Sequence, residues 1–170
     1  VLTQASETFT FTQVDEEPVP SILRGFSAPV VLDFDYSDAQ LLALLEHDTD
    51  PFNRWEAGQR LALRRALKAI AAEGDATQAP VLDEAYLNAM RQVLRHPMLD
   101  AAFKELVLTL PSEGYIAEQL DVVDPQRVHA VREAMRQQLA NALQADWAWA
   151  FDAHQDNGAY RPDPVSSGRR

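Results

Sequence analysis

The side chains with the greatest potential for chemistry are four histidines: His47, His96, His129 and His154. A zinc-protease helix needs two histidines four residues apart with a glutamate between them, because that spacing puts all three side chains on one helix face. The closest two, His129 and His154, are many helical turns apart. The sequence therefore contains no histidine pair of this kind.

The nearest approach to a ligand cluster is His47-Asp48 followed by Asp50. Three such side chains could contribute to a metal site. The competing interpretation is local, because a cationic His47 suits the end of one helix and Asp50 suits the cap of the next. We favour the local interpretation.

Other reactive groups also have simpler interpretations. Glu16-Glu17 and Asp83-Glu84 could form an acid/base pair, but solvation and a helix dipole account for them. His129 is expected on the surface or a packed edge of a long helix. Trp147, Trp149 and Phe151 could line a pocket, although core packing or contact with another segment is favoured, and Trp55 is interpreted as an anchor between helices.

Nucleophile and phosphate motifs are absent from the sequence. It has no cysteine, no Gly-x-Ser-x-Gly elbow and only single, scattered glycines. We therefore predict no catalytic, cofactor-binding or metal-ligating residue in this chain.

The amino-acid composition limits the kinds of molecule and surface that the chain is expected to bind. The formal net charge is -11 and the sequence pI is about 4.7, which disfavours nucleic acid and anionic membranes. The absence of cysteine excludes a disulfide scaffold. No apolar run approaches the ~20 residues of a membrane span, and the N-terminus lacks the pattern of a signal peptide. We expect a cytoplasmic location.

The first 36 residues carry β signals. Residues 6–14 alternate, with Phe9 and Phe11 on one face and threonines on the other. Residues 22–26 and 28–36 are two further short strand candidates. Three strands make only a small sheet. We interpret them as a short β-sandwich remnant that needs further structure to cover it.

Helix signals begin at Ser37, where Ser37-Asp38-Ala39-Gln40 has the form of a capping box. Asp50-Pro51 starts a second helix, expected to end near Gly74 and to be followed by a loop over 75–79. Further helices are predicted over about 80–95, 99–110, 112–120 and 124–153, and another start is predicted at Asp163-Pro164.

This order, strands first and helices afterwards, predicts a segregated α+β chain. We expect two domains: residues 1–36 as the C-terminal strands of a β-sandwich domain, and residues 37–170 as the N-terminal part of an α-helical domain. The helices are expected to form an irregular bundle or superhelix. The chain starts and stops as if cut from something longer, since a helix opening at Asp163 would be truncated.

Three stretches resemble the aminopeptidase N family, most closely its bacterial, alanyl-preferring branch. Residues 18–30 resemble strands near the end of its third domain. A second stretch resembles the start of its C-terminal helical domain: Leu45-Glu46-His47-Asp48-Thr49-Asp50-Pro51-Phe52-Asn53-Arg54-Trp55-Glu56-Ala57-Gly58-Gln59. A third stretch is similar to a later part of that helical domain. It comprises residues 108–113, Asp124-Pro125 and residues 132–134. The resemblance covers essentially the whole chain.

The resemblance implies that the parent is a zinc metallopeptidase that removes N-terminal residues from peptides. In the family, a His-Glu-x-x-His helix and a downstream glutamate hold the zinc, and Gly-x-Met-Glu-Asn recognises the free amine. None of these motifs has a match here, so no functional residue is carried over. The chain would be a non-catalytic segment that helps to enclose the active-site cavity. Its partners would be the catalytic and remaining helical segments of the parent, which supplies the zinc and meets the peptide substrates.

Two other readings remain. The chain could be a stand-alone α-helical module that binds a peptide or protein in a groove without enzymatic activity. It could also be an independent enzyme with an unrecognised site, which the missing nucleophiles and ligand pairs disfavour.

Overall fold

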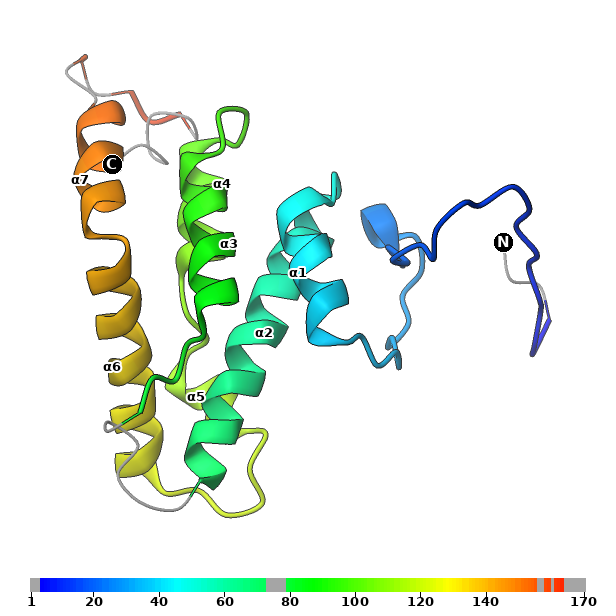
Figure 1. The fold of residues 1–170 in the computed structure, drawn as a ribbon, viewed down its shortest axis with the longest axis horizontal. Helices are drawn as coiled ribbons and strands as arrows, with labels where there is room; N and C mark the ends of the chain where they lie inside the picture. Colours follow the sequence, from blue (N-terminus) through cyan, green and yellow to red (C-terminus); the bar gives the residue numbers. More distant parts are fainter. Residues whose placement is uncertain (1–3, 73–78, 156–157, 160, 164–170) are drawn as a thin grey trace.

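The computed structural model describes residues 4–72, 79–155, 158–159 and 161–163. These residues form helices α1 to α7, one short 3-10 helix, η1, and no strand. Figure 1 shows α6 and α7 following one another in a column beside α3 and α4, with α2 and α1 next to them and the N-terminal segment extending away. The elements are η1 (Arg24–Phe26), α1 (Asp38–His47), α2 (Pro51–Ala71), α3 (Glu84–Arg95), α4 (Ala101–Leu108), α5 (Glu113–Ala117), α6 (Pro125–Ala142) and α7 (Gln144–Ala153).

Side-chain caps start most of these helices. Ser37 forms the predicted capping box with Gln40, since each side chain accepts a hydrogen bond from the other residue's backbone N–H. Pro51 and Pro125 occupy the first helical positions behind aspartate caps, as predicted. The predicted starts at Ser37, Asp50, Ser112 and Asp124 are confirmed. The capping residues are Ser37, Asp50, Asp83, Asp100, Ser112 and Asp124.

Three predicted helices are shorter than expected, and the one predicted over 112–120 covers only Glu113–Ala117. The helix predicted from residue 80 begins only at Glu84, because the Gln138 side chain on α6 accepts hydrogen bonds from the backbone of Val81 and Leu82 at 3.0 and 2.9 Å. The helix predicted over 99–110 covers only residues 101–108, since Asp100 is its cap. The predicted features at Gly74, over 75–78 and after Pro164 lie outside the described residues.

The long helix predicted over 124–153 is two helices. The backbone leaves helical geometry at Leu143, whose φ and ψ are -108° and 21°. Leu143 is fully buried, and Arg91 on α3 donates a hydrogen bond to the Ala142 carbonyl at 3.0 Å. A side chain that captures a carbonyl in this way is a recognised cause of a helix break. The break lets α6 pack on α2 while α7 packs on α3.

The described residues form none of the three predicted strands. Residues 6–14, 22–23 and 28–36 form no strand, and residues 24–26 form η1. A strand is stable only when a neighbour satisfies its backbone, and no described segment pairs with these residues. The two side chains that were predicted to lie on the buried face of the strand over 6–14 are accordingly open to solvent, with Phe9 53% and Phe11 81% exposed. Left-handed φ angles at Leu23, Gly25 and Phe26 also prevent an extended conformation there.

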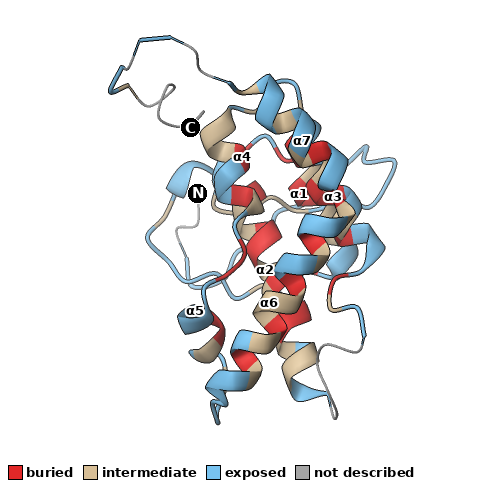
Figure 2. Cartoon of the chain, turned by 90° about the vertical axis from the view of Figure 1, so that its left-hand side faces the viewer, coloured by how far each residue is buried: buried red, intermediate tan, exposed pale blue. Residues whose placement is uncertain are grey.

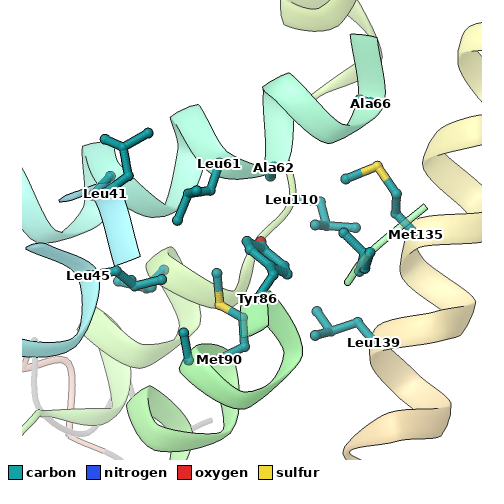
Figure 3. Packing of buried hydrophobic residues seen from close by; sticks show 14 of the residues in the cluster. Leu41, Leu45, Leu61, Ala62, Ala66, Tyr86, Met90, Leu110, Met135 and Leu139 are labelled. Carbon is teal, nitrogen blue, oxygen red and sulfur yellow. The ribbon is translucent and has the colours of Figure 1, made fainter. Parts of the chain in front are cut away.

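The helical part of the predicted fold class is confirmed. Its core lies where α1, α2, α3 and α6 meet, as the buried residues in Figure 2 show. In the apolar stripe that runs from Leu82 to Leu94 in the sequence, Leu82, Tyr86, Met90 and Leu94 are buried. Leu87, the fifth member of the stripe, is half-buried and packs against the core. Figure 3 shows Tyr86 and Met90 reaching toward Leu61 and Leu45, with Met135 and Leu139 on the far side. The helices therefore form one continuous apolar core.

Candidate functional site

The most connected polar group of the described residues joins the N-terminal segment to the turn between α1 and α2. We call it the Asp48 junction, and it consists of Ser21, Arg24, Gly25, Asp48, Asp50 and Asn53. Asp48 follows the last residue of α1, and Asp50 caps α2. Two helix ends separated by three residues thus hold both carboxylates close together, facing the segment at 21–25.

Asp48 is the centre of the junction. Its Oδ1 accepts hydrogen bonds from the Arg24 guanidinium at 2.5 Å and from the Asp50 backbone N–H at 2.9 Å. Its Oδ2 accepts one from the Ser21 hydroxyl at 2.6 Å. The Asp48 side chain is 1% exposed. Burial alone would raise the pKa of this carboxyl, but the three donors outweigh it and lower the pKa.

Asp50 both caps α2 and holds the segment. One of its oxygens accepts from the Asn53 N–H at 3.0 Å, and the other accepts from the Gly25 N–H at 2.8 Å. These bonds, led by the one from Asn53, lower the pKa of Asp50. The Asn53 side chain completes the contact by donating to Ser21 Oγ at 2.9 Å and to the Ile22 carbonyl at 3.0 Å.

Arg54 supports the junction from beneath. It is buried and donates to the carbonyls of Leu45 and Glu46, both at 2.7 Å, which closes the end of α1. Burial lowers the pKa of Arg54, and the charge of Asp48 partly opposes this. Because both aspartates are ionised and held by donors, the junction is suited to fixing two segments together rather than to transferring protons.

A cleft of about 460 Å³ lies beside the junction, between the α1–α2 turn and the α3–α4 turn. His47 and His96 both line it, together with Asp48 and Asp100. Burial, with the charges of Arg54 and Lys104, lowers the pKa of His96, whose Nδ1 accepts from the Met98 N–H at 3.2 Å. Across the described ranges, no three histidine or acidic side chains are grouped to hold a metal ion. The residues present therefore do not fit a zinc site.

A second polar cluster ties α7 to α3. Asp146 accepts hydrogen bonds from Arg91 at 3.0 Å and from Arg95 at 2.7 Å, and these two arginines lower its pKa, with Arg95 making the largest contribution. The Arg95 guanidinium also lies 4.2 Å from the centre of the Trp149 ring. Trp149 therefore helps to hold α7 to α3, although it is 36% exposed and lies outside the buried core.

Changing Asp146 to asparagine is expected to lower the free energy of unfolding by about 1 kcal/mol. The amide keeps the shape but loses the charge that two arginines share, and both arginines are 40% exposed and so remain partly hydrated. Urea denaturation of the purified protein measures the change. The variant Asp152→Asn, on the exposed side of α7, is the matched control and should leave the midpoint unchanged. Equal effects of the two changes would contradict the role given to Asp146.

The other residues singled out in the sequence are dispersed. His129 contacts the Glu113 carboxylate at 2.8 Å on the surface, and His154 donates to the Ala150 carbonyl at 2.8 Å. Glu16-Glu17 is exposed, whereas Asp83 caps α3 and accepts from Arg65. The remaining aromatic residues divide by burial: Trp55 and Trp147 pack against the core, and Phe151 is 71% exposed.

Sequence reasoning missed the three partners of the aspartates, which are Ser21, Arg24 and Asn53. Arg24 lies in a stretch interpreted as a strand, Ser21 directly precedes that stretch, and Asn53 lies inside a helix. The sequence did offer one indication of these contacts, which was the position of the residues within the stretches that resemble the family. The junction forms between residues 18–30 and residues 45–59, which are two of the three stretches that carry the family resemblance.

Comparison with known families divides the chain into two parts. Residues 38–170 match the family described as "Domain of unknown function (DUF3458_C) ARM repeats". Residues 1–35 match the family described as "Domain of unknown function (DUF3458) Ig-like fold", although their described portion contains no strand.

Individual relatives of the chain are aminopeptidases. Aminopeptidase N of Caulobacter vibrioides is 38% identical over 170 residues, which is 100% of this chain and 19% of that protein. Aminopeptidase N of Escherichia coli is 38% identical over 153 residues, which is 90% of this chain and 18% of that protein. A crystal structure of Legionella pneumophila aminopeptidase A in complex with aspartic acid superposes with a TM-score of 0.74 at 26% identity, covering 93% of this chain and 18% of that one. The chain thus spans about a fifth of the length of the relatives it matches.

Proposed function

Because the chain belongs to the DUF3458_C family of ARM-repeat domains, we propose that it is a non-catalytic structural segment of a zinc aminopeptidase. Its resemblance to aminopeptidase N is confirmed by relatives at 34–38% identity. In the proposal, the parent removes N-terminal residues from peptides in the cytoplasm. In the same proposal, the parent holds its zinc outside this segment, which is supported by the absence of any group of three histidine or acidic side chains among the described residues.

The observation that supports this role best is the Asp48 junction. We propose that residues 1–36 belong to a β-sandwich domain and residues 37–170 to a helical domain. The junction then fixes the angle between the two, because Arg24 and Gly25 on one side bond to Asp48 and Asp50 on the other. A rigid connection is what a helical cover needs if it is to enclose an active-site cavity. The catalytic domain and the remaining helices of the parent are its partners.

No described helix combines the length and the apolar character required to cross a membrane. The proposed cytoplasmic location of the parent rests on the resemblance alone.

The native size of the polypeptide tests the proposal. An antibody raised against residues 50–59 is expected to detect, in extract of the source cells, a band several-fold larger than 19.0 kDa. That band should co-elute with aminopeptidase activity that a zinc chelator removes. A band at 19 kDa alone, without such activity, would overturn the proposal and favour a stand-alone binding module.

The 19.0 kDa chain itself is expected to leave alanine p-nitroanilide intact when zinc is supplied. The reason is that the zinc-binding and amine-binding motifs of the resembled family have no match in its sequence. Colorimetric release of nitroaniline measures this, with a complete aminopeptidase N as the positive control. Zinc-dependent turnover by the chain alone would show that it carries a site of its own.

A further inference from the structure

A second pocket lies where the N-terminal segment crosses α1 and the start of α2, and neither the fold comparison nor the proposed function assigns it a role. Its volume is about 300 Å³, near the lower end of the range for small-molecule sites. Its walls are largely apolar and include Ile22, Leu32, Leu41, Leu44 and Phe52, and its two charged lining residues are Glu56 and Arg60.

One carboxylate, that of Glu56, lines this apolar pocket. Glu56 is half-buried, and it makes no hydrogen bond or ion pair with any other described residue. Burial raises the pKa of Glu56, and the charge of Arg60 only partly offsets the rise. An ionised carboxylate in such surroundings is costly unless a partner satisfies it.

The expected internal partner is engaged elsewhere. Arg60 lies one helical turn after Glu56, where Glu–Arg pairs usually form. Its guanidinium instead donates to the Phe34 carbonyl at 3.0 Å and lies 5.3 Å from the centre of the Tyr36 ring. Both contacts hold Arg60 to the segment before α1. The Glu56 carboxylate is thereby left to face the pocket.

The residues that line the pocket determine which kind of ligand it can bind. A single carboxylate offers too few oxygen ligands for a calcium or magnesium ion, and it repels an anion. Apolar walls disfavour a strongly hydrated cation without an apolar group. The Phe52 ring lies 4.7 Å from Phe26 and 5.7 Å from Trp55, between ring centres, so it is an aromatic surface held in place. Aromatic rings and carboxylates both favour an organic cation.

We propose that this pocket binds a small organic ammonium ion that carries an apolar group. Its ammonium group donates to the Glu56 carboxylate, and its apolar part lies against Leu41, Leu44 and Phe52. The proposal does not depend on the aminopeptidase assignment, because it follows from the lining of the pocket alone.

The test compares phenethylammonium with phenethyl alcohol, which has nearly the same shape but no charge. Titration calorimetry or NMR shift mapping of the purified protein is expected to show the amine binding at least tenfold more tightly than the alcohol. The shifts should fall on Leu41, Leu44 and Phe52. No binding of the amine, or equal binding of the two, overturns the proposal.

Two variants distinguish binding of the amine in this pocket from non-specific attraction of a cation to an acidic protein. Glu56→Gln keeps the shape of the side chain and is expected to weaken amine binding about tenfold and to abolish the preference over the alcohol. Glu105→Gln, in the exposed part of α4, is the matched control and should change neither affinity. Equal losses in the two variants would assign the binding to the net charge and overturn the proposal. Circular dichroism melting of Glu56→Gln checks that it is folded, and the comparison of amine with alcohol on the unchanged protein does not depend on that variant.

Discussion

Replacing Gly58 with leucine is expected to lower the free energy of unfolding by about 3 kcal/mol, whereas alanine is expected to raise it by about 0.5–1 kcal/mol. Gly58 is buried in α2, where three other helices approach it. A β-carbon built there would lie 3.4 Å from Leu45, 3.6 Å from Met90 and 3.7 Å from Val107. Figure 3 shows Leu45 and Met90 side by side in this region.

The leucine and alanine variants change the free energy of unfolding in opposite directions because of the space available around Gly58. Those three distances are ordinary contacts, so an alanine methyl group fits and removes the entropic cost of glycine in a helix. The further carbons of leucine have no room, because α1, α3 and α4 each supply one of the three contacts. Thermal unfolding should show a melting temperature lower by about 10 °C for leucine and slightly higher for alanine. A leucine variant as stable as the original would show that the helices are not packed this closely.

Local signals in the sequence predicted the helix starts well. Ser37, Asp50, Ser112 and Asp124 act on backbone groups two or three residues away, so their effect is visible in the sequence itself. The same is true of the 3.6-residue stripe that buries Tyr86 and its neighbours. Such features are determined within a single helix.

Long-range contacts account for what the sequence did not reveal. The late start of α3 depends on Gln138, more than fifty positions away, and the break at Leu143 depends on Arg91. The predicted strand over 6–14 has the right alternation, but a strand forms only when a neighbouring strand is present. The Asp48 junction escaped prediction for the same reason, since Ser21 and Arg24 meet Asp48 only after the chain has folded.

Replacing Asp48 with alanine is expected to lower the free energy of unfolding by about 2–3 kcal/mol and to release the segment at 20–26 from the helices. The change leaves three donors without an acceptor, including the buried N–H of Asp50, and unmade bonds of this kind are costly. Arg24 is 45% exposed and regains water, so the loss stays below that of a fully buried ion pair. Hydrogen exchange at the Asp50 amide should become faster. Asp35→Ala, at a carboxylate that is 99% exposed and paired with Arg64, is the control and should be nearly neutral.

Lowering the pH should reduce the difference in free energy of unfolding between the original protein and the Asp48→Ala variant. The pKa of Asp48 is lowered in the folded state, so its stabilising contribution is complete above the ordinary carboxyl pKa of about 4 and is lost as the pH falls through the lower folded value. The difference in free energy of unfolding is therefore expected to be constant from about pH 5 to 7 and to shrink below about pH 4. Urea denaturation of both proteins at several pH values measures it. A difference that grows on acidification would mean that the Asp48 carboxyl is protonated in the fold, and that its contacts with Arg24 and Ser21 do not lower its pKa.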